Sequence, residues 1–191
     1  MRSLLRPALA FVALMTLLTG VLYPVVITGL AQLFFPTQAN GSLVEVNGMA
    51  RGSRLIGQPF SAPGYLWSRP SATGPTPYNG AASSGSNQGP SNPALHDAVA
   101  ARIAELRAAD STLSRPVPVD LVTASASGLD PHVSLAAAAG QVPRIARARG
   151  MTPEAVQAVV SAHTEGRFLG VFGEPRVNVL LVNLAFDGAA P

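Results

Sequence analysis

The stretch RPALAFVALMTLLTGVLYPVVITGLAQLFF, residues 6–35, has no charged side chain after Arg6 and is almost wholly apolar. A helix rises about 1.5 Å per residue, so about 20 residues cross a hydrocarbon core about 30 Å thick. This run is longer than that. We therefore expect one transmembrane helix over residues 9–35, with a short segment, 1–8, before it and one folded domain, 36–191, after it.

The basic residues near this helix predict its orientation. Arg2 and Arg6 precede it, and no basic residue follows it until Arg51. Because basic flanking residues stay on the cytoplasmic side, we expect residues 1–8 in the cytoplasm, the helix in the cell inner membrane and the domain in the periplasm or otherwise outside. The alternative is a cleaved secretory signal ending near Thr37-Gln38-Ala39. Signal cores run only about 7–15 residues, which favours the membrane anchor.

Three residues inside the apolar run bear on helix packing. Pro24 cannot donate a helical hydrogen bond, which predicts a kink near Leu22 to Pro24. Gly20 and Gly29 would let a partner helix approach closely. Gly and Pro are also commoner in membrane helices in general. These residues are therefore equally compatible with a helix that is surrounded by membrane lipid and packs against no partner helix.

The composition excludes several kinds of site. The chain has no cysteine, which excludes disulfides and thiolate metal ligands. All 13 of its basic residues are arginines, and a Walker A phosphate loop needs a lysine. The three histidines form no pair with metal-ligand spacing. The arginines are scattered among ten acidic residues, so we expect no nucleic acid partner. Because the kinds of site named above are excluded, we also expect no metal and no catalytic centre.

The predicted domain has a mixed pattern of strands and helices, α/β or α+β. Short strands are expected at Leu43–Val46 and Leu55–Ile56, in part as a hairpin, because Asn47-Gly48 suits a type I′ turn. Residues 61–93 are crowded with Gly, Pro, Ser and Asn and predict a long loop. Its aromatic residues favour a functional loop over a disordered one.

Start and stop signals predict three helices in the second half of the chain. The first begins at Pro93 behind Ser91 or Asn92 and runs past Leu106. The second begins near Ser134, is interrupted at Pro143 and ends at Gly150, and the third runs from Thr152 to about His163. Strands are expected at Val117–Thr123 and Val177–Phe186, the latter fully buried.

Eight segments follow one another along nearly the whole chain: RPAL at 6–9, QANGSLVEVNG at 38–48, RGSRLIGQPF at 51–60, SRPSATGPTPYN at 68–79, GSNQGPSNPAL at 85–95, DLVTASASGLDPHVS at 120–134, QVPRIARARG at 141–150 and VNVLLVNLAFD at 177–187. In this order they resemble the C chain of Kdp-type potassium-transporting P-type ATPases. No single segment is a catalytic signature, and the resemblance rests on their shared order.

The resemblance implies an accessory subunit of a complex that hydrolyses ATP to import potassium at low external concentration. The family's complex contains a channel-like potassium-binding subunit, a P-type ATPase subunit and a very small stabilising subunit. This chain lacks the Asp-Lys-Thr-Gly motif of the phosphorylated subunit. The implied role is therefore assembly, stability and potassium uptake, with no tightly bound cofactor.

The resemblance also implies a second role, that of a catalytic chaperone that raises the ATP affinity of the pump subunit through a Ser-Gly-Gly-Ser-Asn loop. The matching residues here are Ser83, Ser84, Gly85, Ser86, Asn87 and Gln88. Ser84 stands where the family's loop has a glycine, and its Cβ would hinder a close approach of backbone to phosphate. The alternative is an ordered loop that packs on its own domain or on the channel subunit.

A third hypothesis is a membrane-anchored periplasmic hydrolase built on the serines between Thr123 and His132. A nucleophile elbow needs Gly-x-Ser-x-Gly, which the segment lacks, so we expect no hydrolase there. Ser134 is instead predicted to cap the following helix. Asp120 and Asp130 could attract potassium near a pore mouth, but solvated surface charge is the explanation that the pattern favours.

Overall fold

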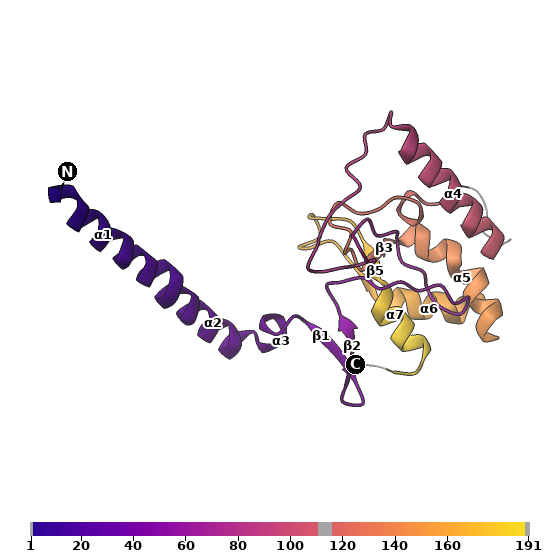
Figure 1. Cartoon of the computed structure of the whole chain (residues 1–191). Helices are drawn as coiled ribbons and strands as arrows, with labels where there is room; N and C mark the ends of the chain where they lie inside the picture. Colours follow the sequence, from indigo (N-terminus) through magenta and orange to yellow (C-terminus); the bar gives the residue numbers. More distant parts are fainter. Residues whose placement is uncertain (1, 111–115, 190–191) are drawn as a thin grey trace. The chain divides into compact units, whose positions relative to one another are not determined.

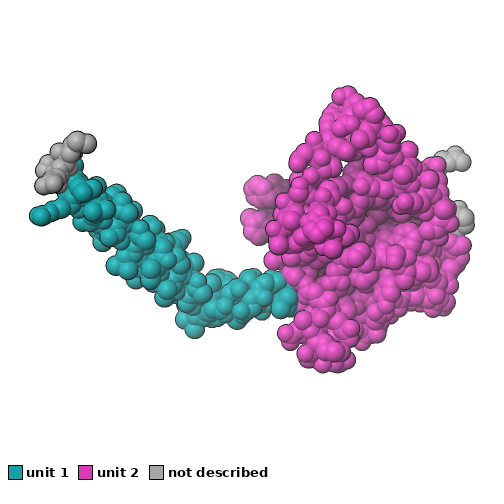
Figure 2. Space-filling model, in the orientation of Figure 1, with its two compact units in different colours: residues 1–43 teal, residues 44–191 magenta. Residues whose placement is uncertain are grey.

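The computed structural model of the chain describes residues 2–110 and 116–189, with side chains from residue 4 onward (Figure 1). The chain divides into two compact units, Met1–Leu43 and Val44–Pro191, which Figure 2 colours teal and magenta. The first unit is helical and the second combines helices with two small sheets. The predicted mixed fold behind one apolar N-terminal helix is confirmed.

The first unit is built on one apolar helical run. It consists of α1 (Arg2–Leu17), a π-helical turn (Leu18–Leu22) and α2 (Tyr23–Phe34), followed by the short α3 (Pro36–Ala39). The 31 residues Leu4–Phe34 are long and apolar enough to cross a membrane, and none of them is buried. A π turn, Leu18–Leu22, lies immediately before α2, where Pro24 has no N–H to donate, and the kink predicted near Leu22 to Pro24 stays a prediction.

The second unit opens with the predicted hairpin. Strand β1 (Leu43–Val46) pairs with β2 (Met49–Ser53), and the turn residues Asn47 and Gly48 have φ angles of 53° and 72°. These positive angles are what a type I′ turn requires, so the turn prediction is confirmed. The strand predicted at Leu55–Ile56 is wrong, because these residues lie in a turn instead.

Residues 54–92, all of which the structure describes, contain no helix or strand. The predicted long loop is therefore confirmed, and side-chain hydrogen bonds hold it in place. Ser71 Oγ accepts from Tyr78 N at 2.9 Å and donates to Gly128 O at 2.7 Å. Gly57 N donates to Leu129 O at 2.8 Å. The loop is fixed against the segment that precedes Pro131.

The three predicted helices form where their caps lie. Helix α4 (Pro93–Ala109) is capped by Asn92, α5 (Leu135–Arg149) by Ser134 and α6 (Pro153–Ala162) by Thr152, each through a side-chain oxygen that accepts a backbone N–H. Such oxygens satisfy donors that have no partner inside the helix. Gly150 ends α5 in the left-handed conformation, with φ 65°.

Pro143 does not interrupt α5, so that prediction is wrong. The helix continues through it to Arg149. Pro143 itself faces solvent, whereas its neighbours Val142, Arg144 and Ile145 are buried. Burial of that face outweighs the cost of a mid-helix proline, about 3 kcal/mol.

The two strands predicted in the second half are also corrected. Val117–Thr123 contains a 3₁₀ turn, Val119–Leu121, rather than a strand. In Val177–Phe186 only the start is extended, as β5 (Arg176–Asn178), and α7 (Val179–Phe186) follows directly. Asn178 causes the switch, because its side chain accepts a hydrogen bond from Leu181 N at 3.2 Å and caps α7.

A small antiparallel sheet and the surrounding helices enclose the core. Strand β5 lies between β3 (His132–Ser134) and β4 (Thr164–Glu165). The main core contains fully buried side chains from α5, α6, β5, α7 and the long loop, among them Ile145, Val156, Val177, Val182 and Leu66. A smaller cluster joins the β1 hairpin to α7, through Val44, Val46, Leu180, Leu181 and Leu184. The long loop is thus part of the core.

Candidate functional site

The predicted nucleotide loop, residues 83–88, is exposed on its outer side and bonded on its inner side. Ser84 N donates to Ser127 O at 3.0 Å, and Ser83 Oγ donates to the same oxygen at 3.0 Å. A Cβ placed on Gly85 would lie 2.7 Å from Ala126 O, inside normal contact distance. The glycine is therefore required by close packing of the loop on residues 126–127.

Two backbone donors that an anion would need are already used. Ser84 N–H bonds Ser127, and Ala94 N–H in the first turn of α4 bonds the Asn92 side chain at 3.0 Å. Ser84 does not have a positive φ, whereas Asn87 does, at 51°. Ser84, Ser86 and Asn87 are exposed, and Gln88 is half-buried. The nucleotide assignment of residues 83–88 remains a prediction.

A polar cluster lies around Asp130. Arg69 Nη1 donates to Asp130 Oδ2 at 2.8 Å, and His132 N donates to Asp130 Oδ1 at 3.0 Å. The His132 ring lies between two carboxylates, with Nδ1 3.3 Å from Asp130 Oδ1 and Nε2 3.6 Å from Glu165 Oε2. Burial works to raise the pKa of Asp130, but the bonds from His132 and Arg69 outweigh it and lower that pKa.

This cluster borders a cavity of about 280 Å³ that is lined by charged residues from the loop and from β3 and β5. Both ring nitrogens of His132 face carboxylates, whereas the base of a nucleophilic triad must face a nucleophile with one of them. Ser134 Oγ donates to Asp120 Oδ1 at 3.1 Å and caps α5. Among the described residues, no group of three or more His, Asp or Glu side chains could hold a metal ion.

Sequence reasoning missed Arg144, a buried charged residue with several polar partners. Its side chain is 4% exposed. Nη1 donates to Pro63 O at 2.5 Å and to Tyr65 O at 3.0 Å, and Nη2 donates to Gln141 Oε1 at 2.6 Å. The guanidinium also stacks on Trp67, 3.6 Å from the ring centroid. Burial lowers its pKa to about 10, opposed by Asp110, so it stays charged at neutral pH.

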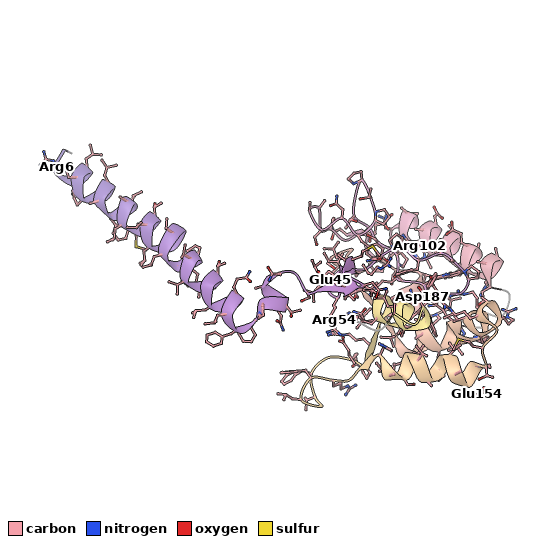
Figure 3. The ribbon with its side chains drawn as sticks, turned by 90° about the horizontal axis from the view of Figure 1, so that it is seen from below. Arg6, Glu45, Arg54, Arg102, Glu154 and Asp187 are labelled. Carbon is pink, nitrogen blue, oxygen red and sulfur yellow. The ribbon has the colours of Figure 1, made fainter. Side chains whose placement is uncertain are left out.

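Arg149, five residues further along α5, holds the same part of the loop. It donates to Gly64 O at 2.6 Å and to Asp187 Oδ1 at 2.9 Å, and Asp187 also accepts from the Tyr65 hydroxyl at 2.9 Å. Figure 3 labels Asp187 at the end of α7. The position of Arg144 among the apolar core residues of α5 was the signal in the sequence that could have identified it. It pointed to a buried arginine that needs carbonyl partners from a loop.

The residues predicted to pack the membrane helix lie where expected along the chain. Gly20 is in the π turn and Pro24 is the second residue of α2. A Cβ on Gly29 would meet nothing within 4 Å, and one on Gly20 would meet only Thr16, at 3.9 Å. The surface at these glycines is therefore open to lipid or to another helix, and their packing role remains a prediction.

Comparison with known proteins identifies relatives along nearly the whole chain. The family model described as "K+-transporting ATPase, c chain" matches residues 5–188. A potassium-transporting ATPase KdpC subunit of Burkholderia cenocepacia (strain HI2424) is 60% identical over 189 residues, which are 99% of this chain and 98% of the relative. The protein of the same name from Herpetosiphon aurantiacus is 62% identical over 98% of this chain and 97% of its own. That from Dechloromonas aromatica is 58% identical over 100% of both.

Proposed function

The chain belongs to the KdpC family, the C chains of potassium-transporting ATPases, and on that basis we propose that it is a non-catalytic, membrane-anchored subunit of an ATP-driven potassium import complex. Its partners in that complex are a channel-like potassium-binding subunit, a P-type ATPase subunit and a small stabilising subunit. Potassium is the transported ion, and ATP is hydrolysed by the partner.

The observation that carries this proposal is the apolar helix Leu4–Phe34, none of whose residues is buried. An apolar helix of this length needs lipid or partner helices around it. The open surface at Gly20 and Gly29 would allow a partner helix to approach backbone to backbone. The helix therefore serves to bind this chain to the membrane subunits.

The orientation proposed for the domain follows from charge. Arg2 and Arg6 lie before the helix and Arg51 is the first basic residue after it, which favours a cytoplasmic N-terminus and a periplasmic domain in the inner membrane. In this orientation the domain acts at the potassium entrance, where it stabilises the assembled complex. The core-bound loop held by Arg144 and Arg149 gives it a rigid surface for that contact.

The second candidate is direct contact of residues 83–88 with ATP, as a catalytic chaperone of the pump subunit. It would need an inward-facing domain, or coupling through the membrane helix without direct contact. The hydrogen bond of Ser84 N–H to Ser127 and the close packing of Gly85 favour a structural loop over this role. A membrane-anchored hydrolase is the least supported reading, because His132 faces carboxylates on both sides.

The proposal is tested by expressing the three partner subunits with and without this chain. We expect that without it the complex fails to purify intact and that potassium-stimulated ATP hydrolysis is lost. Gly29→Leu, which closes the open helix surface, should weaken copurification, while Ala13→Leu serves as a substitution of similar size at another position of the helix. An intact complex with unchanged turnover in the absence of the chain would contradict the proposal.

A further inference from the structure

The segment between β4 and β5, residues 166–175, is a hairpin with an apolar tip. Phe168, Leu169, Val171 and Phe172 are 71%, 76%, 71% and 64% exposed. The pale yellow loop that extends away from the helices of the domain in Figure 3 is this segment. Soluble proteins rarely expose so many large apolar side chains in one place unless that surface binds a partner.

The hairpin is held in shape by its own backbone rather than by apolar packing. Phe168 N donates to Phe172 O at 2.8 Å, and Phe172 N donates back to Phe168 O at 2.9 Å. Leu169 and Gly170 at the apex have φ angles of 52° and 75°. At the base, Arg167 Nη2 lies 3.0 Å from Glu174 Oε2. The tip therefore has a preformed conformation, and its apolar side chains are exposed and able to contact a binding partner.

The distribution of exposure indicates what covers the tip. All four apolar side chains are exposed by more than six tenths, so neither side of the ribbon is packed on the domain. A flat protein surface would cover one side of such a ribbon and leave the other in water. A medium that surrounds the tip, such as the interfacial region of a bilayer, covers both sides.

The charges of the hairpin fit the same medium. Residues 168–173 carry no charge, whereas both strands at its base do. Arg167 pairs with Glu174, and Arg176 Nε lies 2.9 Å from Glu165 Oε2. An apolar tip above a charged base, with arginines able to reach phosphates, matches the change from hydrocarbon to headgroups at a membrane surface.

The chain itself keeps the domain near a bilayer. Helix α2 ends at Phe34 and β1 begins at Leu43, so the two are joined by residues 35–42. Fully extended, the nine Cα–Cα steps from Phe34 to Leu43 span about 32 Å, at about 3.5 Å per step. The first strand cannot move further than this from the end of the membrane helix. A lipid surface is thus always within reach of the domain at high effective concentration.

We propose that the 166–175 hairpin inserts its tip, Phe168 to Phe172, into the lipid headgroup and upper acyl region of the bilayer that holds the chain's own helix. It forms a second membrane contact that restricts the tilt of the domain on its connector. The inference rests on the helix being a membrane anchor and does not depend on which side of the membrane the domain occupies.

The test uses the full chain in lipid nanodiscs and exploits its lack of cysteine. A single cysteine at Leu169 carries an environment-sensitive fluorophore, and lipids brominated on the upper acyl chain serve as quenchers. Glu154→Cys, on the exposed start of α6 and labelled in Figure 3, is the matched control. We expect quenching at position 169 to exceed that at position 154 several-fold. Phe168→Ser with Phe172→Ser in the Leu169→Cys background should remove most of it.

Two outcomes would overturn this inference while leaving the proposed function untouched. Equal, weak quenching at both positions would show that the tip remains in water. Protection of position 169 from a water-soluble quencher only when the partner subunits are added, without quenching by lipid, would assign the tip to a protein pocket. Conversely, lipid quenching in the chain alone supports the inference even if complex assembly proves independent of this chain.

Discussion

Replacing Arg144 by methionine should destabilise the domain strongly, because the side chain joins α5 to the long loop. Arg144→Met keeps the length and the apolar stem of the side chain but removes the guanidinium. The carbonyls of Pro63 and Tyr65, which now accept from Nη1 at 2.5 and 3.0 Å, would lose that donor. The stacking on Trp67 at 3.6 Å would be lost as well.

The expected magnitude follows from burial. Hydrogen bonds from a charged donor contribute about 1.5–3 kcal/mol each, and removing one partner of a buried ion pair costs about 3–5 kcal/mol. Asp110, 3.7 Å from Arg144 Nε, retains Arg147 at 3.1 Å, which lowers the penalty. Methionine also recovers some apolar burial. We expect a loss of about 3 kcal/mol in the free energy of unfolding, a large part of the stability of a domain this size.

Urea unfolding of the full chain in detergent, followed by far-ultraviolet circular dichroism, measures this loss. The midpoint should fall while the slope with urea stays constant. Arg107→Met is the matched control, because Arg107 is exposed near the end of α4 and its replacement should change stability by less than about 0.5 kcal/mol. If Arg144→Met matched the stability of the Arg107 variant, the role assigned to Arg144 in holding the loop would be refuted.

Three further substitutions test other parts of the structure. Asp130→Asn should lower the free energy of unfolding by about 1–3 kcal/mol at pH 7. Because the pKa of Asp130 is lowered in the folded state, the difference from wild type should shrink as the pH falls below about 4. Thermal melts at pH 7 and pH 3 measure this, and an equal difference at both pH values would contradict the prediction. Gly85→Ala should cost about 1–3 kcal/mol, since its Cβ would meet Ala126 O, whereas Gly89→Ala, with nothing within 4 Å, should be neutral or slightly stabilising in the same melts. Pro143→Ala should raise the melting temperature and increase the free energy of unfolding by up to about 3 kcal/mol, because an exposed mid-helix proline is replaced by a strong helix former. A lower melting temperature would show that the proline is needed for packing.

Local signals in the sequence predicted much of the fold. Asn92, Ser134 and Thr152 each mark a helix start, because a side-chain oxygen before an apolar periodic run satisfies the first free N–H groups. Gly150 and Asn47-Gly48 mark a helix end and a hairpin turn, because both need positive φ. These features depend on a few neighbouring residues, so a sequence alone contains them.

The errors arose where distant contacts override local preference. Val177–Phe186 is apolar and rich in valine, which favours a strand, but Asn178 caps α7 and the buried helix packs on both core clusters. Pro143 stays inside α5 because burial of its neighbours outweighs the lost hydrogen bond. The burial of α7 and of the neighbours of Pro143 depends on residues far away in the sequence, which periodicity does not include, whereas the Asn178 cap is a local signal that was missed.

The candidate site was predictable only in outline. The resemblance implied a nucleotide-binding loop at residues 83–88. The contact that fixes the inner side of this loop is with Ser127, which lies 43 residues beyond Ser84 along the chain. Arg144 reaches loop carbonyls about 80 residues away, as the separations of 81 and 79 residues show. No spacing rule links such positions, so only the folded structure brings them together.

The most direct test of the proposed role is the side of the membrane on which residues 83–88 lie. Ser86→Cys introduces one exposed thiol into a cysteine-free chain, and intact cells are labelled with a membrane-impermeant thiol reagent before and after the inner membrane is permeabilised. Leu4→Cys, at the other end of the membrane helix, is the control that should label only after permeabilisation. Labelling of Ser86→Cys in cells with an intact inner membrane is the predicted result and would support action at the potassium entrance. Labelling only after permeabilisation would contradict that account and favour contact with cytoplasmic ATP.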